Sequence, residues 1–228
     1  LTLFQEQEDQ AGCAAAISGL GTIHRLRGQY DQAIALYGQA IDLVRGGTID
    51  GSVGVYHGIL ANAHNALGQY ARAMEMYTKA IAYAQELGDR RHEGMWLGNT
   101  GVLCQAQGQY ERAIELYNQA IAIARELGHK LNEGVNIGNR GDSLFKLKRW
   151  DESEDSLRQA ITIVDGAYPA GAGAFRGSLA HLLAQRGQHE EAHQLIETGL
   201  KQVEPYPEEY AKFLAKKGHV QHLAGDSR

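Results

Sequence analysis

The chain has 228 residues, of which 43% are hydrophobic and 21% charged, so it is long and apolar enough to bury a substantial core. Its formal net charge of −5 lacks the basic excess of nucleic-acid-binding proteins, so we expect no nucleic-acid partner. No apolar run reaches the about 18 to 20 residues that cross a membrane, and Leu1–Phe4 lacks the features of a signal peptide, so no membrane partner is expected. Cys13 and Cys104 lie in separate apolar helical segments, which favours a reducing, cytoplasmic location over a disulfide framework.

A three-residue signature recurs along the whole chain. Gly28-Gln29-Tyr30 returns at spacings of 40, 40, 40 and 39 residues, as Gly68-Gln69-Tyr70, Gly108-Gln109-Tyr110, Lys148-Arg149-Trp150 and Gly187-Gln188-His189. A fixed period in this range indicates a solenoid, in which each repeat buries its apolar face only by stacking on its neighbours. Such a surface is extended and has no enclosed active site, which favours binding over catalysis.

Each repeat is predicted to be an antiparallel pair of helices. After the signature, apolar residues recur at spacings of three and four, which indicates an amphipathic second helix. These second helices are predicted to begin at Tyr30, Tyr70, Tyr110, Trp150 and Gln188. A first helix precedes each of them, for example at 54–67 and 94–107, and ends at the signature glycine, where a left-handed residue suits a helix C-terminus. In the fourth repeat Lys148 replaces that glycine, and we expect about 1 kcal/mol of strain there.

The pattern predicts one continuous all-α domain over 1–228. Residues 1–9 resemble the tail of a second helix, because they align with 81–89 and 121–129. Five repeats follow at about 14–53, 54–93, 94–133, 134–172 and 173–210, and a sixth first helix fills 211–225, its helical pattern running from Glu208 to Ala224. The interrupted ends indicate a fragment of a longer array, with natural caps as the alternative. Exposed apolar residues at these ends, among them Phe4, Phe213 and Leu214, would then favour end-to-end self-association.

The repeats resemble tetratricopeptide repeats. The pattern of small, aromatic and alanine residues in that family appears as Gly21, Tyr30, Ala33, Tyr37 and Ala40, and again as Gly101, Tyr110, Ala113, Tyr117 and Ala120. Because the period is 40 and not about 34, the segments 93–101 and 133–141 resemble the long-helix subclass of kinesin light chain, spindle-orientation adaptors and bacterial signalling proteins. The resemblance implies a right-handed superhelical solenoid of antiparallel hairpins, whose concave surface is lined by the first helices and binds a peptide or protein. It also implies no catalytic residue and no cofactor. The alternative is a regulatory ligand- or peptide-sensing module of a larger signalling protein.

Asparagine and glycine residues on the first helices are the candidate peptide-binding residues. Asparagine carries both a donor and an acceptor for the amides of an extended peptide, and its poor helix propensity disfavours it in a helix without another role. Glycines near the expected concave surface would let a ligand backbone approach closely, with crowding between helices as the alternative explanation. The candidate set is Asn62, Asn65, Gly98, Asn99, Gly138, Asn139 and Asp142.

Two motifs are discounted on the sequence. A clamp for a C-terminal carboxylate, as some tetratricopeptide domains carry, is incomplete here, since Lys212 and Lys216 supply a basic pair but Gly138, Asp142 and Ser178 do not match the remaining positions. Residues 189–193 satisfy the zinc motif HExxH, yet His189 stands in the slot of the signature tyrosine and no third ligand follows. We therefore expect no metal site, and expect the ten histidines to be mostly half-buried, hydrogen-bonded side chains.

Overall fold

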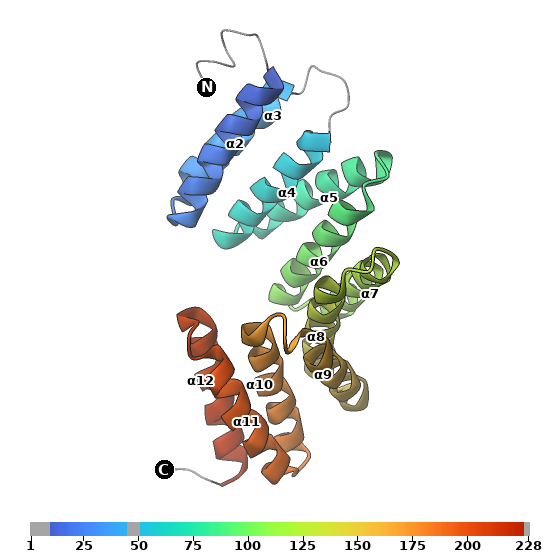
Figure 1. Ribbon diagram of the computed structural model, residues 1–228, viewed down its shortest axis with the longest axis vertical. Coiled ribbons are helices and arrows are strands. Elements are labelled where there is room, and N and C mark those ends of the chain that lie inside the picture. The colour runs from blue at the N-terminus through green and yellow to red at the C-terminus, as the bar shows by residue number, and fades with distance from the viewer. Residues whose placement is uncertain (1–9, 45–50, 226–228) are drawn as a thin grey trace. The chain divides into compact units, whose positions relative to one another are not determined.

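A computed structural model describes residues 10–44 and 51–225 of the chain. These residues form eleven α-helices and no strand (Figure 1). The helices are α2 (Gln10–Leu26), α3 (Tyr30–Val44), α4 (Gly51–Ala66), α5 (Tyr70–Glu86), α6 (Arg90–Ala106), α7 (Tyr110–Glu126), α8 (Lys130–Lys146), α9 (Trp150–Val164), α10 (Pro169–Gln185), α11 (His189–Val203) and α12 (Pro207–Leu223). The predicted all-α repeat solenoid is confirmed, whereas the predicted helical tail at 1–9 lies outside the described residues.

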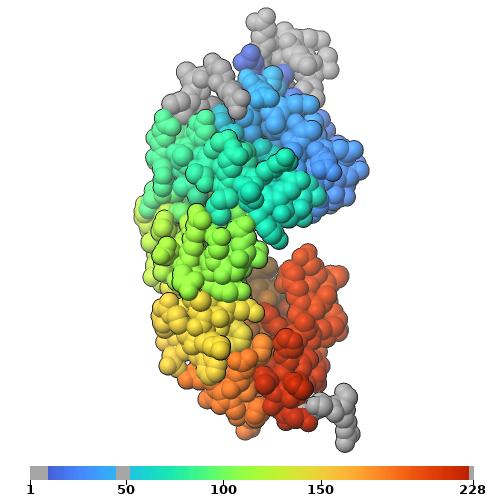
Figure 2. Space-filling model, turned by 180° about the vertical axis from the view of Figure 1, so that it is seen from behind, coloured from blue at the N-terminus to red at the C-terminus, as the bar shows by residue number. Residues whose placement is uncertain are grey.

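Helices pack against their neighbours along the chain. First and second helices of a repeat pair as α2 with α3, α4 with α5, α8 with α9 and α10 with α11, and the first helix α10 also contacts α8 and α12. The contacts divide the chain into two compact units, Leu1–Leu103 and Cys104–Arg228, within each of which the helices follow one another as successive bands of colour (Figure 2). The continuous domain over 1–228 therefore stays a prediction.

Most predicted helix starts agree with the structure, and the first helices are longer than expected. Four second helices begin at the predicted residues, while the fifth begins at His189, one residue after the predicted start. Helix α6 begins at Arg90 and has 17 residues, because Asp89 caps it: the Asp89 carboxylate accepts a hydrogen bond of 3.0 Å from the backbone N–H of His92. First and second helices of 15 to 17 residues together account for the 40-residue period.

The signature glycines end the first helices in the left-handed conformation, as predicted. At Gly68 (φ 70°), the N–H of Gln69 donates to the carbonyl of His64 at 2.9 Å and that of Gly68 to Asn65 at 2.9 Å, which is a Schellman turn. The same turn holds Lys148 at φ 59°, which makes it the only described non-glycine residue with positive φ. The expected site of backbone strain is thus confirmed.

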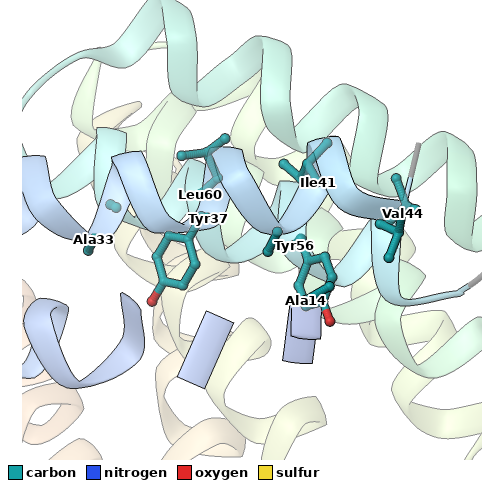
Figure 3. Close-up of a cluster of buried hydrophobic side chains, with 10 residues drawn as sticks. Ala14, Ala33, Tyr37, Ile41, Val44, Tyr56 and Leu60 are labelled. Atoms are coloured by element: carbon teal, nitrogen blue, oxygen red, sulfur yellow. The ribbon is translucent and has the colours of Figure 1, made fainter. Parts of the chain in front are cut away.

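In three repeats the core is built around one buried tyrosine ring of the second helix, and Leu157 and Ile196 take that place in the last two. In the first unit, Tyr37, Ile41 and Val44 of α3 lie together with Ala14 of α2 and Leu60 of α4 (Figure 3). The central tyrosines are almost wholly buried, with exposed fractions of 0% for Tyr37, 1% for Tyr77 and 0% for Tyr117.

The buried tyrosine hydroxyls each have a hydrogen-bond partner on a first helix, because a buried hydroxyl without one would be costly. The hydroxyls of Tyr37 and Thr22 lie 3.2 Å apart. The Tyr77 hydroxyl donates to Asn62 Oδ1 at 2.5 Å. The Tyr117 hydroxyl donates to Gln105 Oε1 at 2.9 Å. Burial raises the pKa of Tyr77 and of Tyr117 above the ordinary tyrosine value.

A buried carboxylate joins the end of one repeat to the start of the next. Glu133 of α8 is 4% exposed and accepts hydrogen bonds from Arg125 Nε at 2.7 Å and Lys130 Nζ at 2.9 Å. These two bonds hold the pKa of Glu133 below the ordinary glutamate value. Glu93 of α6 is placed in the same way, with Gln85 donating to it at 2.9 Å.

The expected exposure of the terminal apolar residues is wrong for Phe213. Phe213 is 1% exposed, since its ring packs over Gly177 and Gly199, within 2.8 Å and 2.7 Å of where their Cβ atoms would stand. Leu214 is 42% exposed, as expected, and Phe4 lies outside the described residues. End-to-end association therefore stays a prediction that has lost one of its supporting residues.

Two further findings concern the environment of the chain. None of the helices described here is both long and apolar enough to cross a membrane. Cys13 and Cys104 are buried and carry free thiols, and burial raises the pKa of the Cys104 thiol, which disfavours the reactive thiolate.

Candidate functional site

The candidate residues divide between the two units. Asn62, Asn65, Gly98 and Asn99 lie in the first unit on α4 and α6, and Gly138, Asn139 and Asp142 lie in the second on α8. All seven lie on first helices, as predicted.

Asn62 and Asn99 are in contact in the first unit. The side-chain amide Nδ2 of Asn99 donates to Asn62 Oδ1 at 3.3 Å, and the same oxygen accepts the hydroxyl of Tyr77 at 2.5 Å. The Oδ1 atom of Asn62 is therefore engaged within the unit. The Nδ2 atom of Asn62 and the Oδ1 atom of Asn99 make no hydrogen bond with any described residue, and both side chains are half-buried. This pair offers one donor and one acceptor, which are the two groups that an extended peptide backbone requires.

Three other candidates have side chains without hydrogen bonds in the described parts of the chain. Asn65 lies three residues after Asn62 and is half-buried. Asn139 is half-buried on α8, where its backbone carbonyl accepts the Ser143 hydroxyl at 3.1 Å. Asp142 is half-buried, and its charge adds to burial in raising the pKa of Tyr117. The structure thus leaves their binding role open as a prediction.

The glycines of the first helices are explained by crowding between helices. The ring of Phe175, on the next first helix, lies where a Cβ atom on Gly138 would have to stand, and Trp96 occupies the same place over Gly58. Gly177 is covered likewise by Phe213, whose ring would lie 2.8 Å from a Cβ atom. Phe175 already fills the space over Gly138, which favours crowding between helices as the reason for this glycine, and a role for Gly138 in ligand binding stays a prediction. Gly98 is buried on α6, and its role stays a prediction.

A different set of glycines makes the close contact between the two helices of one repeat. A Cβ atom on Gly21 would stand 2.7 Å from the Tyr37 ring, and one on Gly141 would stand 2.9 Å from Leu157. The lack of a side chain lets the two helices of one repeat pack closely at both positions, whereas Gly218 of α12 has no atom within 4 Å of its Cβ position.

The histidines are mainly structural in the regions described. The Nδ1 atoms of His24 and His64 lie 2.7 Å from the Oε1 atoms of Gln29 and Gln69, so the signature glutamine bonds the histidine five residues before it. That spacing could have been recognised in the sequence. His189 and His193 are both exposed on α11, and no group of three His, Cys, Asp or Glu side chains in the described residues could hold a metal ion.

One cluster on the first helices was not anticipated. Phe145 of α8, His181 of α10 and His219 of α12 form a continuous series of ring contacts across three repeats. These residues are dispersed in the sequence, and only the fact that they recur about once per period could have indicated their proximity.

Models of the tetratricopeptide repeat match the chain at residues 16–48, 53–126 and 173–198, which together make up more than half of it. The chain belongs to the tetratricopeptide-repeat family. Members of this family act as protein-interaction scaffolds, and the family is generally non-catalytic. No curated protein matches the chain in sequence.

Solved tetratricopeptide structures share the fold at low sequence identity. The apo form of RapI superposes with a TM-score of 0.81 at 15% identity, covering 93% of this chain and 81% of RapI. BtubC (BKLC) from P. vanneervenii gives 0.77 at 17% identity, with 87% and 83% covered. A Rap protein complexed with Competence and Sporulation Factor gives 0.74 at 16% identity, covering 86% of this chain and 56% of the Rap protein. At these identities the likeness concerns the fold alone.

Proposed function

We propose that this tetratricopeptide-repeat protein binds a peptide or protein segment on the face formed by its first helices, without performing chemistry and without a cofactor. The observation that supports this most directly is the Asn62–Asn99 pair. It leaves one amide donor and one amide oxygen without partners on half-exposed side chains. Asparagine is a poor helix former, so its presence in a helix favours another role. A free amide donor and a free amide oxygen can bond the C=O and N–H groups of a peptide backbone.

The surroundings of this pair support binding more than solvation. Asn62 Oδ1 is held by the buried Tyr77 hydroxyl at 2.5 Å, so the orientation of the amide is set before a ligand arrives. A preorganised donor loses little rotamer freedom on binding, which raises affinity.

The test uses the whole chain as bait for partners in a lysate, followed by mass spectrometry and affinity measurement with the purified partner. Substitution of Asn99 and Asn139 by alanine is expected to weaken the complex by about 1 to 3 kcal/mol through unpaired amides. The matched control is Glu75→Ala on the second helix α5, an exposed side chain that only pairs with Lys79 at 2.6 Å. Retention of the partner by the asparagine variant would show that it docks elsewhere.

A sensing module of a larger signalling protein is the second candidate. It is favoured by one observation, the similarity in fold to a Rap protein complexed with Competence and Sporulation Factor. The complete open reading frame that encodes this chain discriminates between the scaffold and the sensing module. An effector domain encoded next to this chain would support the sensing role. A reading frame that contains tetratricopeptide repeats and nothing else contradicts it.

A further inference from the structure

A row of aromatic rings crosses the first helices of the second unit. The Phe145 ring of α8 and the His181 ring of α10 have centroids 5.1 Å apart, and the His181 and His219 rings, the latter on α12, are also 5.1 Å apart. Helix α10 contacts both α8 and α12 (Figure 1), so the row follows the stacking of three consecutive repeats. His219 is exposed, and Phe145 and His181 are half-buried, which leaves the row open to a ligand.

Lysine side chains flank this row and lack acidic partners. Lys146 follows Phe145 on α8 and is exposed. Lys216 of α12 reaches across to α10, where its Nζ donates to Ser178 Oγ at 2.7 Å and to the backbone carbonyl of Ala174 at 3.1 Å. Both acceptors are neutral. Over residues 10–44 and 51–225, neither lysine forms an ion pair.

The charged groups that shift the pKa of His181 are positive. Burial lowers the pKa of His181, and the nearby His219, Lys146 and Lys216 lower it further. Helices α9 and α11 also pack against α10, and the main causes of the shift include none of their charged groups. Lys212, on the same helix as His219, differs in this respect, because Glu208 and Glu209 lie 2.8 Å and 3.1 Å from its Nζ.

We call Lys146, His181, Lys216 and His219 the cationic patch. We propose that the cationic patch docks the side-chain carboxylates of an acidic peptide segment, and that docking strengthens as the pH falls from about 8 to about 6. The inference rests on the proposed function, since it names the partner chemistry for the first-helix face of the second unit.

Charge complementarity favours an acidic peptide as the ligand of the cationic patch. The positive charges of Lys146 and Lys216 attract a carboxylate, which then forms charge-assisted hydrogen bonds with them. The rings of Phe145 and His181 supply an apolar surface for the methylene groups of glutamate. A carboxylate beside an imidazole favours the protonated form, so binding takes up protons and must tighten at lower pH by linkage.

The probe is an octapeptide of alternating glutamate and glycine, acetylated and amidated, with a matched peptide that carries glutamine in place of glutamate. Titration calorimetry of the full chain is expected to show the glutamate probe binding about ten-fold more tightly at about pH 6 than at about pH 8, since one pKa unit of coupling corresponds to ten-fold in affinity. The glutamine probe should bind weakly and without pH dependence. The pKa of His181, measured from its imidazole NMR signals, should rise when the glutamate probe is added.

Variants separate the two kinds of cation. His181→Gln with His219→Gln should abolish the pH dependence of glutamate-probe binding. Lys146→Met, on an exposed side chain, should weaken binding at both pH values and leave the pH dependence in place. The matched controls are His193→Gln and Lys201→Met, both on exposed residues of α11, and they should change neither quantity.

Four outcomes would overturn the inference. Binding of the glutamate probe that is independent of pH, or pH-dependent binding that survives the double histidine variant, would show that the patch is only solvated surface. A glutamine probe with a free C-terminus that binds as tightly as the glutamate probe would identify the main-chain carboxylate as the ligand instead. A natural partner lost from the asparagine variant but retained by the histidine variant at both pH values refutes this inference alone. Retention of the partner by both variants refutes the proposed function.

Discussion

The side chain of Asn62 is bonded within its own repeat before it contacts any ligand. Its Oδ1 atom is the acceptor for the buried Tyr77 hydroxyl, whereas Asn139, on α8, has no side-chain hydrogen bond with described residues. Two asparagines with the same predicted role therefore differ in what they contribute to the fold.

This difference predicts opposite effects on stability. Asn62→Ala should lower the free energy of unfolding by about 1 to 3 kcal/mol, because the Tyr77 hydroxyl loses its acceptor while buried. Asn139→Ala should raise it by up to about 0.5 kcal/mol, since alanine is the better helix former. Urea denaturation monitored by circular dichroism measures both. In the background of Tyr77→Phe, which removes the hydroxyl, Asn62→Ala should become nearly neutral; an undiminished loss would contradict the role of the hydrogen bond.

Lys148 is the second residue whose local conformation leads to a prediction. Its φ of 59° belongs to the left-handed region, where a Cβ atom is unfavourable. Lys148→Gly is expected to stabilise the protein by about 0.5 to 1 kcal/mol, despite the greater freedom of glycine in the unfolded chain. The control is Gln119→Gly in the interior of α7, which should destabilise by about 1 kcal/mol. Thermal unfolding of the two variants, compared with the parent, decides whether strain at this turn is real.

At the scale of whole elements, first helices of adjacent repeats pack together where an aromatic ring of one lies over a glycine of the other. Gly58 with Trp96, Gly138 with Phe175 and Gly177 with Phe213 are three instances of the same contact. Glycine lowers the stability of each first helix locally, and the packing of an aromatic ring over it offsets that cost.

Two glycine substitutions test this packing. Gly138→Ala should destabilise by about 1 to 3 kcal/mol, because the added methyl group overlaps the Phe175 ring and forces it to move. Gly218→Ala on α12 should instead stabilise by up to about 1 kcal/mol, since no atom lies within 4 Å of its Cβ position and alanine favours the helix. Denaturant midpoints of both variants provide the measurement, and a neutral Gly138→Ala would show that α10 can shift without cost.

The contact between α7 and α8 is predicted to depend on pH through Glu133. Its folded pKa is depressed by Arg125 and Lys130, so its contribution to stability is present above the unfolded pKa of about 4.3 and is lost as the pH falls through the folded value. Glu133→Gln should therefore be less stable than the parent at neutral pH, and the difference should diminish in strong acid. Urea titrations at several pH values test this, with the exposed Glu115→Gln of α7 as a control that should show no such trend. A difference that is the same at all pH values would exclude the ion pairs as its cause.

At the scale of the whole molecule, the helices contact near neighbours in the chain within each unit, as expected of a solenoid. The free energy of unfolding should then be a sum of contributions from repeats and from contacts between neighbouring repeats. A substitution should therefore destabilise mainly the helices close to it. Hydrogen exchange with mass spectrometry of Gly138→Ala is expected to show faster exchange in α8, α9 and α10 and unchanged exchange in α2 to α4. Uniformly faster exchange along the chain would indicate one cooperative unit instead.

Local features were readable from the sequence because their causes lie within a few residues. Helical periodicity, the turn glycines, the strained Lys148 and the 40-residue hairpin depend on neighbours three to five positions away, and they sufficed to predict the all-α solenoid and the family. The early start of α6 was missed because the capping role of Asp89 was not considered.

What required the tertiary structure was which side chains meet across repeats. Gly138 is covered by Phe175, and Phe213 is buried over Gly177, because a ring on one first helix packs against the preceding one, and the helical pattern of one repeat does not show where the next repeat places its side chains. The ring contacts of His181 with Phe145 and His219 likewise join residues 36 and 38 positions apart. The sequence by itself determined the repeated hairpin and its turns, whereas the stacking of repeats decided which polar groups are engaged and which remain for a partner.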